Sequence, residues 1–171
     1  MVTEKLKQVK LLLLDVDGVL TTGGIVYNDN GTETKVFNVR DGLGIRLLME
    51  AGISVGIITG RTSGALSHRC QDLGIHLVFD AVGDKAAVLE QALAKSNATA
   101  DETAFVGDDL PDLPIMNRVG VAIAVADGHE TILENADVIT SATGGNGAVR
   151  EVCEEILKAQ GLWRKTIERF F

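Results

Sequence analysis

The chain has 171 residues, of which 46% are apolar, so we expect residues 1–171 to form one domain with its own hydrophobic core. Its formal net charge of −8 argues against nucleic acid as a partner, because phosphate backbones attract basic surfaces. Cys70 and Cys153 form no CxxC pair, and we expect reduced thiols in a cytoplasmic protein. The apolar run Leu11–Leu14 is too short to cross a bilayer, so no membrane segment or membrane partner is predicted.

Short apolar runs alternate with longer amphipathic stretches along the chain, which is the pattern of strand–helix units around a parallel sheet. The runs are nearly all apolar, as in strands that helices cover on both faces. The predicted fold class is therefore α/β, a Rossmann-like parallel sheet with helices on both faces. The predicted strands are Val9–Asp15, Ile53–Thr59, Leu77–Phe79, Thr103–Val106, Val121–Val125 and Asp137–Thr140. The predicted helices are Asp41–Ala51, Ser63–Leu73, Lys85–Ser96, Asp112–Arg118, Glu130–Asn135 and Ala148–Gln160.

Two segments depart from this rhythm. Residues 24–38, directly after the first strand, carry the Asn-Gly pair Asn30–Gly31 between β-prone runs, which predicts an inserted β-hairpin. A lone hairpin is marginally stable in water, so we expect it to pack against another surface, such as a second subunit. The tail, residues 162–171, ends in Phe170 and Phe171, and both docking and fraying stay open for it.

Polar residues stand where three of the predicted strands end. Ligands of parallel α/β sheets bind outside the carboxyl ends of the strands, so we expect these side chains to meet at one edge. Lys85 opens the helix after the third strand, on the same side. The residues at the three strand ends are Asp15, Asp17, Thr59, Asp108 and Asp109.

Several carboxylates beside a phosphate require a cation, and Mg²⁺ prefers hard oxygen ligands. Asp15 and Asp108 would each supply a side-chain oxygen, and Asp17 its carbonyl. In-line attack by Asp15 on phosphorus would give an aspartyl-phosphate. Asp17 would protonate the leaving alkoxide and later deprotonate the hydrolytic water. Thr59 and Lys85 would stabilise the charge that spreads over the equatorial phosphate oxygens. The sequence therefore predicts a Mg²⁺-dependent phosphomonoesterase.

Two other sites use similar residues. Asp-x-Asp-Gly also begins calcium loops, but Val19 and Leu20 stand where an EF-hand needs the next oxygen ligands. Two-component receiver domains combine Asp, Thr, Lys and an acidic pair, with the acidic pair first and the phospho-accepting Asp after a middle strand. Here the proposed nucleophile follows the first strand and the acidic pair follows the lysine, so the order excludes the receiver domain.

With these motifs the sequence resembles the haloacid dehalogenase (HAD) superfamily of phosphatases. The four motifs of that superfamily correspond to Asp15-Val-Asp17-Gly, Thr59-Gly-Arg61, Lys85 and Gly107-Asp108-Asp109-Leu-Pro-Asp112. Nearly the whole chain is similar to the capless 3-deoxy-D-manno-octulosonate (KDO) 8-phosphate phosphatases. The segments that carry this resemblance are LLLDVDGVLT, KVFNVRDGLGIR, IITGR, VGDDLPDLPIM and GGNGAVREVCEEILKAQG.

The resemblance implies a homotetramer whose hairpins join in a central barrel and whose neighbouring subunits close each active site, in place of a cap domain. Family tails can fold over a neighbour's site. Arginine forks suit the carboxylate that a sugar acid carries besides its phosphate, and we expect Arg61 and Arg69 to share one helix face. The implied metal residues are Asp15, Asp17 and Asp108, with Asp109 and Asp112 in support. The implied substrate contacts are Asp17, Asn38, Val39, Arg40, Asp41, Gly42, Arg46, Gly60, Arg61, Arg69 and Lys85.

The expected reaction is hydrolysis of KDO 8-phosphate to KDO and inorganic phosphate, within lipopolysaccharide biosynthesis. Arg61 favours this eight-carbon substrate, because relatives that act on the nine-carbon KDN 9-phosphate tend to carry an acidic residue directly after the Thr-Gly. Two alternatives stay open. One is a phosphatase of another sugar-acid phosphate, such as KDN 9-phosphate, and the other is a non-catalytic oligomerisation module.

Overall fold

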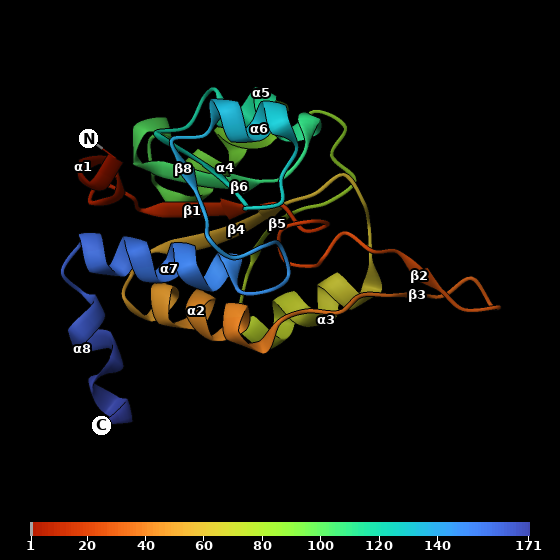
Figure 1. Ribbon diagram of the computed structural model, residues 1–171, viewed down its shortest axis with the longest axis horizontal. Helices are drawn as coiled ribbons and strands as arrows, with labels where there is room; N and C mark the ends of the chain where they lie inside the picture. Colours follow the sequence, from red (N-terminus) through yellow and green to blue (C-terminus); the bar gives the residue numbers. More distant parts are fainter. Residues whose placement is uncertain (1) are drawn as a thin grey trace.

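Six of the apolar runs form one parallel sheet in the computed structural model, which describes residues 2–171 (Figure 1). The spatial order of the strands is β5-β4-β1-β6-β7-β8, and every neighbouring pair is parallel. The α/β fold predicted from the sequence is therefore confirmed. The strands are β1 (Leu11–Leu14), β4 (Ser54–Ile58), β5 (Leu77–Phe79), β6 (Thr103–Gly107), β7 (Val121–Ala124) and β8 (Val138–Ile139).

Strand β1 lies in the middle of the sheet and is buried on both faces. Its residues alternate between the two core layers, as the period of a strand requires: Leu12 and Leu14 belong to one hydrophobic cluster, and Leu11 and Leu13 to the other. The residues that follow β1 therefore emerge between the carboxyl ends of β4 and β6. This edge of the sheet is where residues from several strands can form a site.

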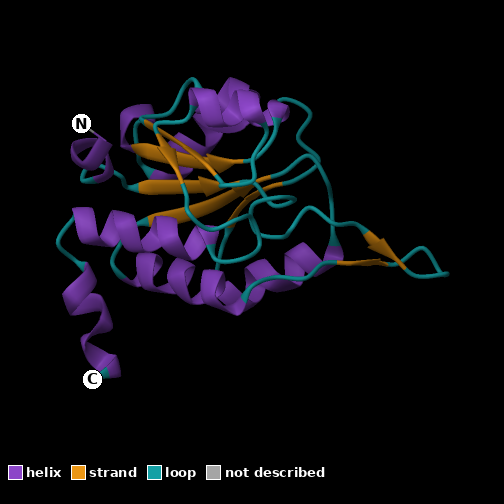
Figure 2. Cartoon of the chain, in the orientation of Figure 1, coloured by secondary structure: helices purple, strands orange, loops and turns teal. Residues whose placement is uncertain are grey.

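Helices cover both faces of the sheet (Figures 1 and 2). One layer contains α2 (Val39–Glu50), α3 (Gly64–Leu73) and α7 (Ala148–Ala159). The other contains α4 (Leu89–Ser96), α5 (Leu113–Met116) and α6 (Glu130–Asn135). The short α1 (Val2–Leu6) was not predicted. Among residues 2–171, no helix combines the length and the hydropathy that a membrane span requires.

Two predicted helices begin with a tighter turn. The helix predicted from Lys85 opens as a 3₁₀ turn, η1 (Lys85–Val88), before α4, and the one predicted from Asp112 follows another, η3 (Leu110–Asp112). A further 3₁₀ turn, η2 (Ala100–Glu102), precedes β6. Such turns are common at helix starts. Here η1 and η3 place Lys85 and Asp112 at the same edge of the sheet as Asp15.

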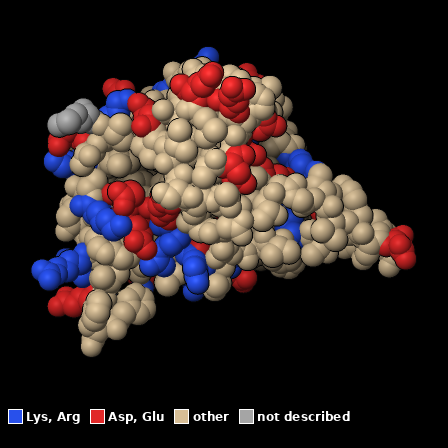
Figure 3. Space-filling model, in the orientation of Figure 1, with Lys and Arg blue, Asp and Glu red and all other residues tan. Residues whose placement is uncertain are grey.

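The inserted hairpin is present, with strands of only two residues each, β2 (Val26–Tyr27) and β3 (Glu33–Thr34). It projects from the end of the molecule at which the parallel strands finish (Figure 1). Its outer surface is largely uncharged apart from an acidic tip (Figure 3). The exposed apolar side chains of this segment are Ile25, Val26, Tyr27 and Val36.

The tail folds as α8 (Trp163–Ile167) and the 3₁₀ turn η4 (Glu168–Phe170). The Trp163 ring packs against the core, with the Arg150 guanidinium 5.7 Å from its centroid, while Phe171 is fully exposed. The tail lies at the end of the molecule opposite the hairpin (Figure 1), so it does not cover the carboxyl edge of its own sheet.

Candidate active site

Three carboxylates converge at the carboxyl edge of the sheet. Asp15 follows β1, Asp108 follows β6, and Asp112 ends η3. One oxygen from each lies within 4.8 Å of the others, the one such acidic cluster found among residues 2–171. Lys85 Nζ donates to Asp15 Oδ1 at 2.6 Å and to Asp112 Oδ1 at 2.5 Å. The structure thus brings together Asp15, Lys85 and Asp108, which the sequence placed at separate element ends, and adds the carboxylate of Asp112 to them.

Asp112 was predicted only to support the metal site, but in the structure it contacts most of the cluster. Its buried carboxylate accepts hydrogen bonds at Oδ2 from the backbone N–H groups of Asp108, at 2.9 Å, and Asp109, at 3.3 Å. Asp109 itself is exposed, and its side chain caps η3 by accepting from Leu110 N at 2.8 Å. The Asp109 carboxylate therefore belongs to the helix cap and not to the three-carboxylate cluster.

The turn after Asp17 needs a glycine for two reasons. Gly18 has φ +99°, in the left-handed region that disfavours other residues. A Cβ on Gly18 would also lie 1.9 Å from Asp108 Oδ2. Gly144 in turn approaches so closely that its own Cβ would lie 1.6 Å from the Gly18 carbonyl oxygen. The two glycines allow the turn after Asp17 to pack closely against Asp108 on one side and against the loop before α7 on the other.

Thr59 lies at the end of β4 with its backbone fully engaged. Its N–H donates to the Phe79 carbonyl at 2.9 Å, and its carbonyl accepts from Val82 N at 3.0 Å. The hydroxyl oxygen accepts from Arg61 N at 3.4 Å, which leaves the hydroxyl hydrogen to donate elsewhere. This geometry fits the predicted role of a donor to a phosphate oxygen.

Burial and repulsion disfavour negative charge in the cluster. Burial first, and then the charges of Asp15 and Asp112, raise the pKa of Asp108 to about 8. Burial also raises the pKa of Asp15 to about 6, although Lys85 opposes this shift. Burial works against the charged form of Lys85 as well, but Asp15 and Asp112 raise its pKa above the ordinary value. A divalent cation would relieve the repulsion, and the donors are the hard oxygens that Mg²⁺ prefers, so the residues fit this ion.

This electrostatic arrangement predicts a pH-dependent effect of Mg²⁺ on stability. Because the folded-state pKa values of Asp15 and Asp108 lie above 3.8, the metal-free folded chain binds more protons than the unfolded chain between about pH 4 and pH 8. We expect its free energy of unfolding to fall as the pH rises through this range. Mg²⁺ should therefore raise the melting temperature more at pH 8 than at pH 5, where protons compete with the cation.

Calorimetry at pH 5, 6, 7 and 8, with Mg²⁺ or with EDTA, measures this effect. Asp108→Asn serves as the control, since it removes the carboxyl group with the most strongly raised pKa and should abolish most of the pH dependence. A Mg²⁺-induced shift of equal size at every pH would contradict the proposed electrostatics.

The carboxylate of Asp17 faces the foot of the hairpin. Lys35 Nζ donates to Asp17 Oδ1, and Arg61 Nε lies 3.8 Å from Oδ2. Glu33 lies 3.2 Å from Lys35 Nζ and also accepts from Arg61, which contacts the Tyr27 hydroxyl as well. The sequence analysis located the hairpin but assigned no role to Glu33 or Lys35. Their spacing of two in a β-prone run, which places both on one face, was the available signal.

Arg61 was expected to share a helix face with Arg69, and this expectation is wrong. Helix α3 begins at Gly64, so Arg61 lies in the preceding loop and turns toward the hairpin. Arg69 is inside α3 and donates to the Asn38 carbonyl at 3.1 Å, with its guanidinium 5.9 Å from the Phe37 ring centroid. Gly42 leaves room for this contact, since a Cβ there would lie 2.2 Å from Arg69 Nη2.

The start of α2 carries four of the other predicted substrate contacts. Asn38 is its N-cap: the side chain accepts from Arg40 N at 2.8 Å and donates to the Gly145 carbonyl at 3.2 Å. Val39 and Arg40 are exposed. The Asp41 residue is only 1% exposed, and its carboxylate accepts from Arg150 N at 2.8 Å, in the first turn of α7. Burial raises the pKa of Asp41, and its carboxylate joins the first turns of α2 and α7.

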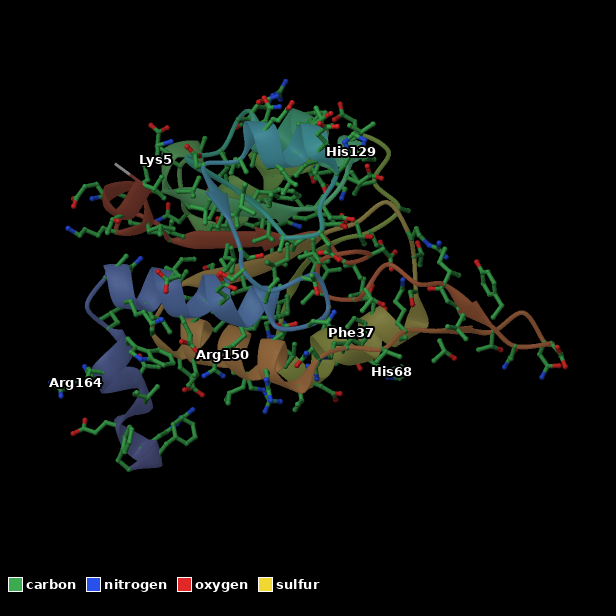
Figure 4. The ribbon with its side chains drawn as sticks, viewed as in Figure 1. Lys5, Phe37, His68, His129, Arg150 and Arg164 are labelled. Atoms are coloured by element: carbon green, nitrogen blue, oxygen red, sulfur yellow. The ribbon has the colours of Figure 1, made fainter. Side chains whose placement is uncertain are left out.

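The last predicted contacts are divided between two places. Gly60 lies between Thr59 and Arg61, where an added Cβ would lie 3.6 Å from the Val82 carbonyl oxygen. Arg46 donates to the Asp72 carbonyl near the end of α3, which leads toward the amino end of β5. Figure 4 shows Phe37 next to α3 and Arg150 beside α2. One chain therefore does not bring Arg46 to the carboxylate cluster.

The fold and the site define a phosphatase of the HAD-like class, and the family model of the haloacid dehalogenase-like hydrolases matches residues 78–152. The chain belongs to the 3-deoxy-D-manno-octulosonate 8-phosphate phosphatases of this class. The phosphatase of that name from Escherichia coli K12 is 46% identical over 160 residues, which cover 94% of this chain and 85% of the relative. That from Yersinia pestis is 44% identical over 159 residues, 93% of this chain and 85% of the relative.

Solved structures agree with this assignment. The KDO 8-phosphate phosphatase of Moraxella catarrhalis, in complex with magnesium, phosphate and KDO, has a TM-score of 0.96 at 45% identity and covers 99% of this chain and 98% of its own. The Yersinia pestis enzyme has a TM-score of 0.94 at 43% identity, covering 95% of this chain and 88% of its own.

Proposed function

We propose that the chain hydrolyses KDO 8-phosphate to KDO and inorganic phosphate, within lipopolysaccharide biosynthesis. The observation that carries this proposal is the cluster of Asp15, Asp108 and Asp112 around Lys85, in a chain 46% identical to phosphatases named for this substrate. The reaction class follows from the site, and the substrate follows from the relatives.

The proposed nucleophile is Asp15. Lys85 holds Oδ1, so Oδ2 is the oxygen that attacks phosphorus. As that bond forms, the P–O bond to the sugar breaks and a protonated Asp17 delivers its proton to the leaving oxygen. Asp17, now a carboxylate, takes a proton from a water that attacks the aspartyl-phosphate, which releases phosphate and restores Asp15.

Two further residues stabilise charge in both steps. The Thr59 hydroxyl and the Lys85 ammonium donate to phosphate oxygens, where the transition-state charge lies. The carboxylates of Asp15 and Asp108 and the carbonyl of Asp17 are proposed to hold Mg²⁺. When bound, this ion neutralises charge between the carboxylates and the phosphate.

The test compares kcat/KM for KDO 8-phosphate and KDN 9-phosphate, each with Mg²⁺ and with EDTA. We expect Mg²⁺-dependent release of phosphate and a preference of at least about tenfold for the eight-carbon substrate, since Arg61 stands where an acidic residue favours the nine-carbon one. A reversed preference would favour KDN 9-phosphate as the substrate. If neither ester released phosphate, the remaining alternative would be a non-catalytic oligomerisation module.

We also propose a homotetramer that assembles through the hairpin. The apolar side chains there stay in water in the single chain, with Val36 74% exposed. The exposed residues Val39 and Arg40 and the distant Arg46 are proposed to complete the site of a neighbouring chain. The tail, which lies away from its own carboxyl edge, is proposed to act there as well.

Light scattering after size exclusion tests the assembly. The wild type should have four times the chain mass of 18.1 kDa, and Val26→Asp should lower the mass because it introduces a charge into the apolar surface. Ile139→Asp, an equally exposed change on β8, is the control and should leave the mass unchanged. An unchanged mass for Val26→Asp would contradict assembly through the hairpin.

A cytoplasmic location is part of the proposal. Cys70 and Cys153 are both free and buried, and burial raises the pKa of each thiol, so neither is reactive. Unpaired cysteines of this kind are typical of a reducing compartment.

A further inference from the structure

The foot of the hairpin closes a ring of alternating charges around Asp17. Lys35 contacts Asp17 Oδ1 and lies 3.2 Å from Glu33, whose other oxygen accepts from Arg61. The Arg61 guanidinium returns to within 3.8 Å of Asp17 Oδ2. Two acids and two bases thus alternate around the ring, and two of the four residues come from the inserted hairpin segment.

Lys35 is the most deeply buried member of this charge ring. Its side chain is 3% exposed, although it belongs to a segment that projects from the sheet. A buried ammonium is costly without partners, and both of its partners here are carboxylates. The contact with Asp17 is therefore a built feature of the fold, unlike the exposed surface pairs such as Lys7 with Glu4.

The ring treats the two oxygens of Asp17 differently. Oδ1 is fixed by Lys35, while Oδ2 is buried and has no hydrogen-bond partner. An acid that exchanges a proton needs one oxygen that accepts no other hydrogen bond and a side chain that does not rotate away. Lys35 meets the second requirement by holding Oδ1, and Oδ2, with Arg61 Nε at 3.8 Å, accepts no hydrogen bond.

We infer that Lys35 is a positioning residue for the acid–base step, which holds Asp17 so that Oδ2 exchanges the proton, and that Glu33 secures Lys35 in this place. The inference rests on the proposed phosphatase mechanism and deepens it. The inserted hairpin thereby has a second function besides assembly, because its foot completes the acid–base apparatus of its own chain.

The experiment separates proton transfer from other effects by the leaving group. An alkoxide needs a proton to depart, whereas p-nitrophenolate does not. Single-turnover rates of phosphoenzyme formation are measured at saturating KDO 8-phosphate and p-nitrophenyl phosphate. We expect Lys35→Met to slow the reaction of the sugar phosphate by about 10- to 100-fold and that of the aryl phosphate by less than about threefold. Lys7→Met, at an exposed surface pair, is the control and should match the wild type.

A double-mutant cycle adds a readout that a purely structural role would not give. If Lys35 acts through Asp17, Lys35→Met should cost little in an Asp17→Asn background. Equal slowing of both substrates, a rise in KM alone, additive losses or no loss would each overturn the inference. Should Lys35→Met fail to fold, Glu33→Gln replaces it in the same cycle, with a smaller selective loss expected. An inactive wild type would instead reject the proposed function.

Discussion

Asp15→Asn is expected to lower kcat for phosphate release from KDO 8-phosphate by about 10⁴-fold or more. An amide neither attacks phosphorus nor forms the acyl phosphate through which the reaction proceeds. The loss should appear in kcat rather than KM, because the groups that bind the rest of the substrate stay in place. Steady-state release of phosphate in the presence of Mg²⁺ measures it, and acid-quenched wild-type enzyme should carry phosphate on Asp15.

The control for this substitution is Asp29→Asn at the exposed hairpin turn, which makes the same chemical change away from the site. Both variants should keep the wild-type circular dichroism spectrum. Substantial Mg²⁺-dependent turnover by the Asp15 variant would contradict its assignment as the nucleophile.

Asp17→Asn is expected to slow both half-reactions by about 10²- to 10⁴-fold, because one side chain serves as acid in the first and base in the second. Rapid-quench kinetics resolves formation of the phosphoenzyme from its decay. The first step should recover most of its rate with p-nitrophenyl phosphate, whose leaving group needs no proton. The second step should stay slow with either substrate, since both pass through the same phosphoenzyme.

An Asp17 variant that forms and hydrolyses the phosphoenzyme at wild-type rates would remove Asp17 from the chemistry. A defect confined to one half-reaction would require a different group for the other. Asp29→Asn again provides the comparison, as it changes the hairpin tip without touching the charge ring.

The carboxylate cluster could be predicted because two simple regularities coincide. Buried parallel strands read as short apolar runs, and their carboxyl ends lie at one edge of the sheet. Asp15 and Asp108 each follow such a run directly, so locating β1 and β6 was enough to place them together. To place Lys85 beside them, it was enough to predict where the helix after β5 begins.

The residues around the cluster are placed by tertiary contacts, and no repeating pattern in the sequence predicts these contacts. The pairing of Asp17 with Lys35 depends on how an irregular segment folds back, and no local pattern specifies it. Asp41 reads as an ordinary acid in the first turn of a helix, where negative charge is favourable. Only the packing of α2 against α7 shows that its carboxylate caps a second helix.

The direction of the Arg61 side chain was also beyond the sequence. Helix α3 begins at Gly64, one residue after its predicted start, and Arg61 lies in the loop that precedes it. The Arg61 guanidinium is directed by Glu33 and Tyr27 of the hairpin, contacts that no local pattern specifies.

The hairpin joins a charged foot, which touches Asp17, to an apolar outer surface that is proposed to meet other chains. Loosening the outer contacts frees a two-stranded ribbon too short to stay folded alone, and the foot loosens with it. Specific activity should therefore decline on dilution before any single chain unfolds. If the proposed assembly holds, the phosphatase would respond to its own concentration, with no regulatory ligand required.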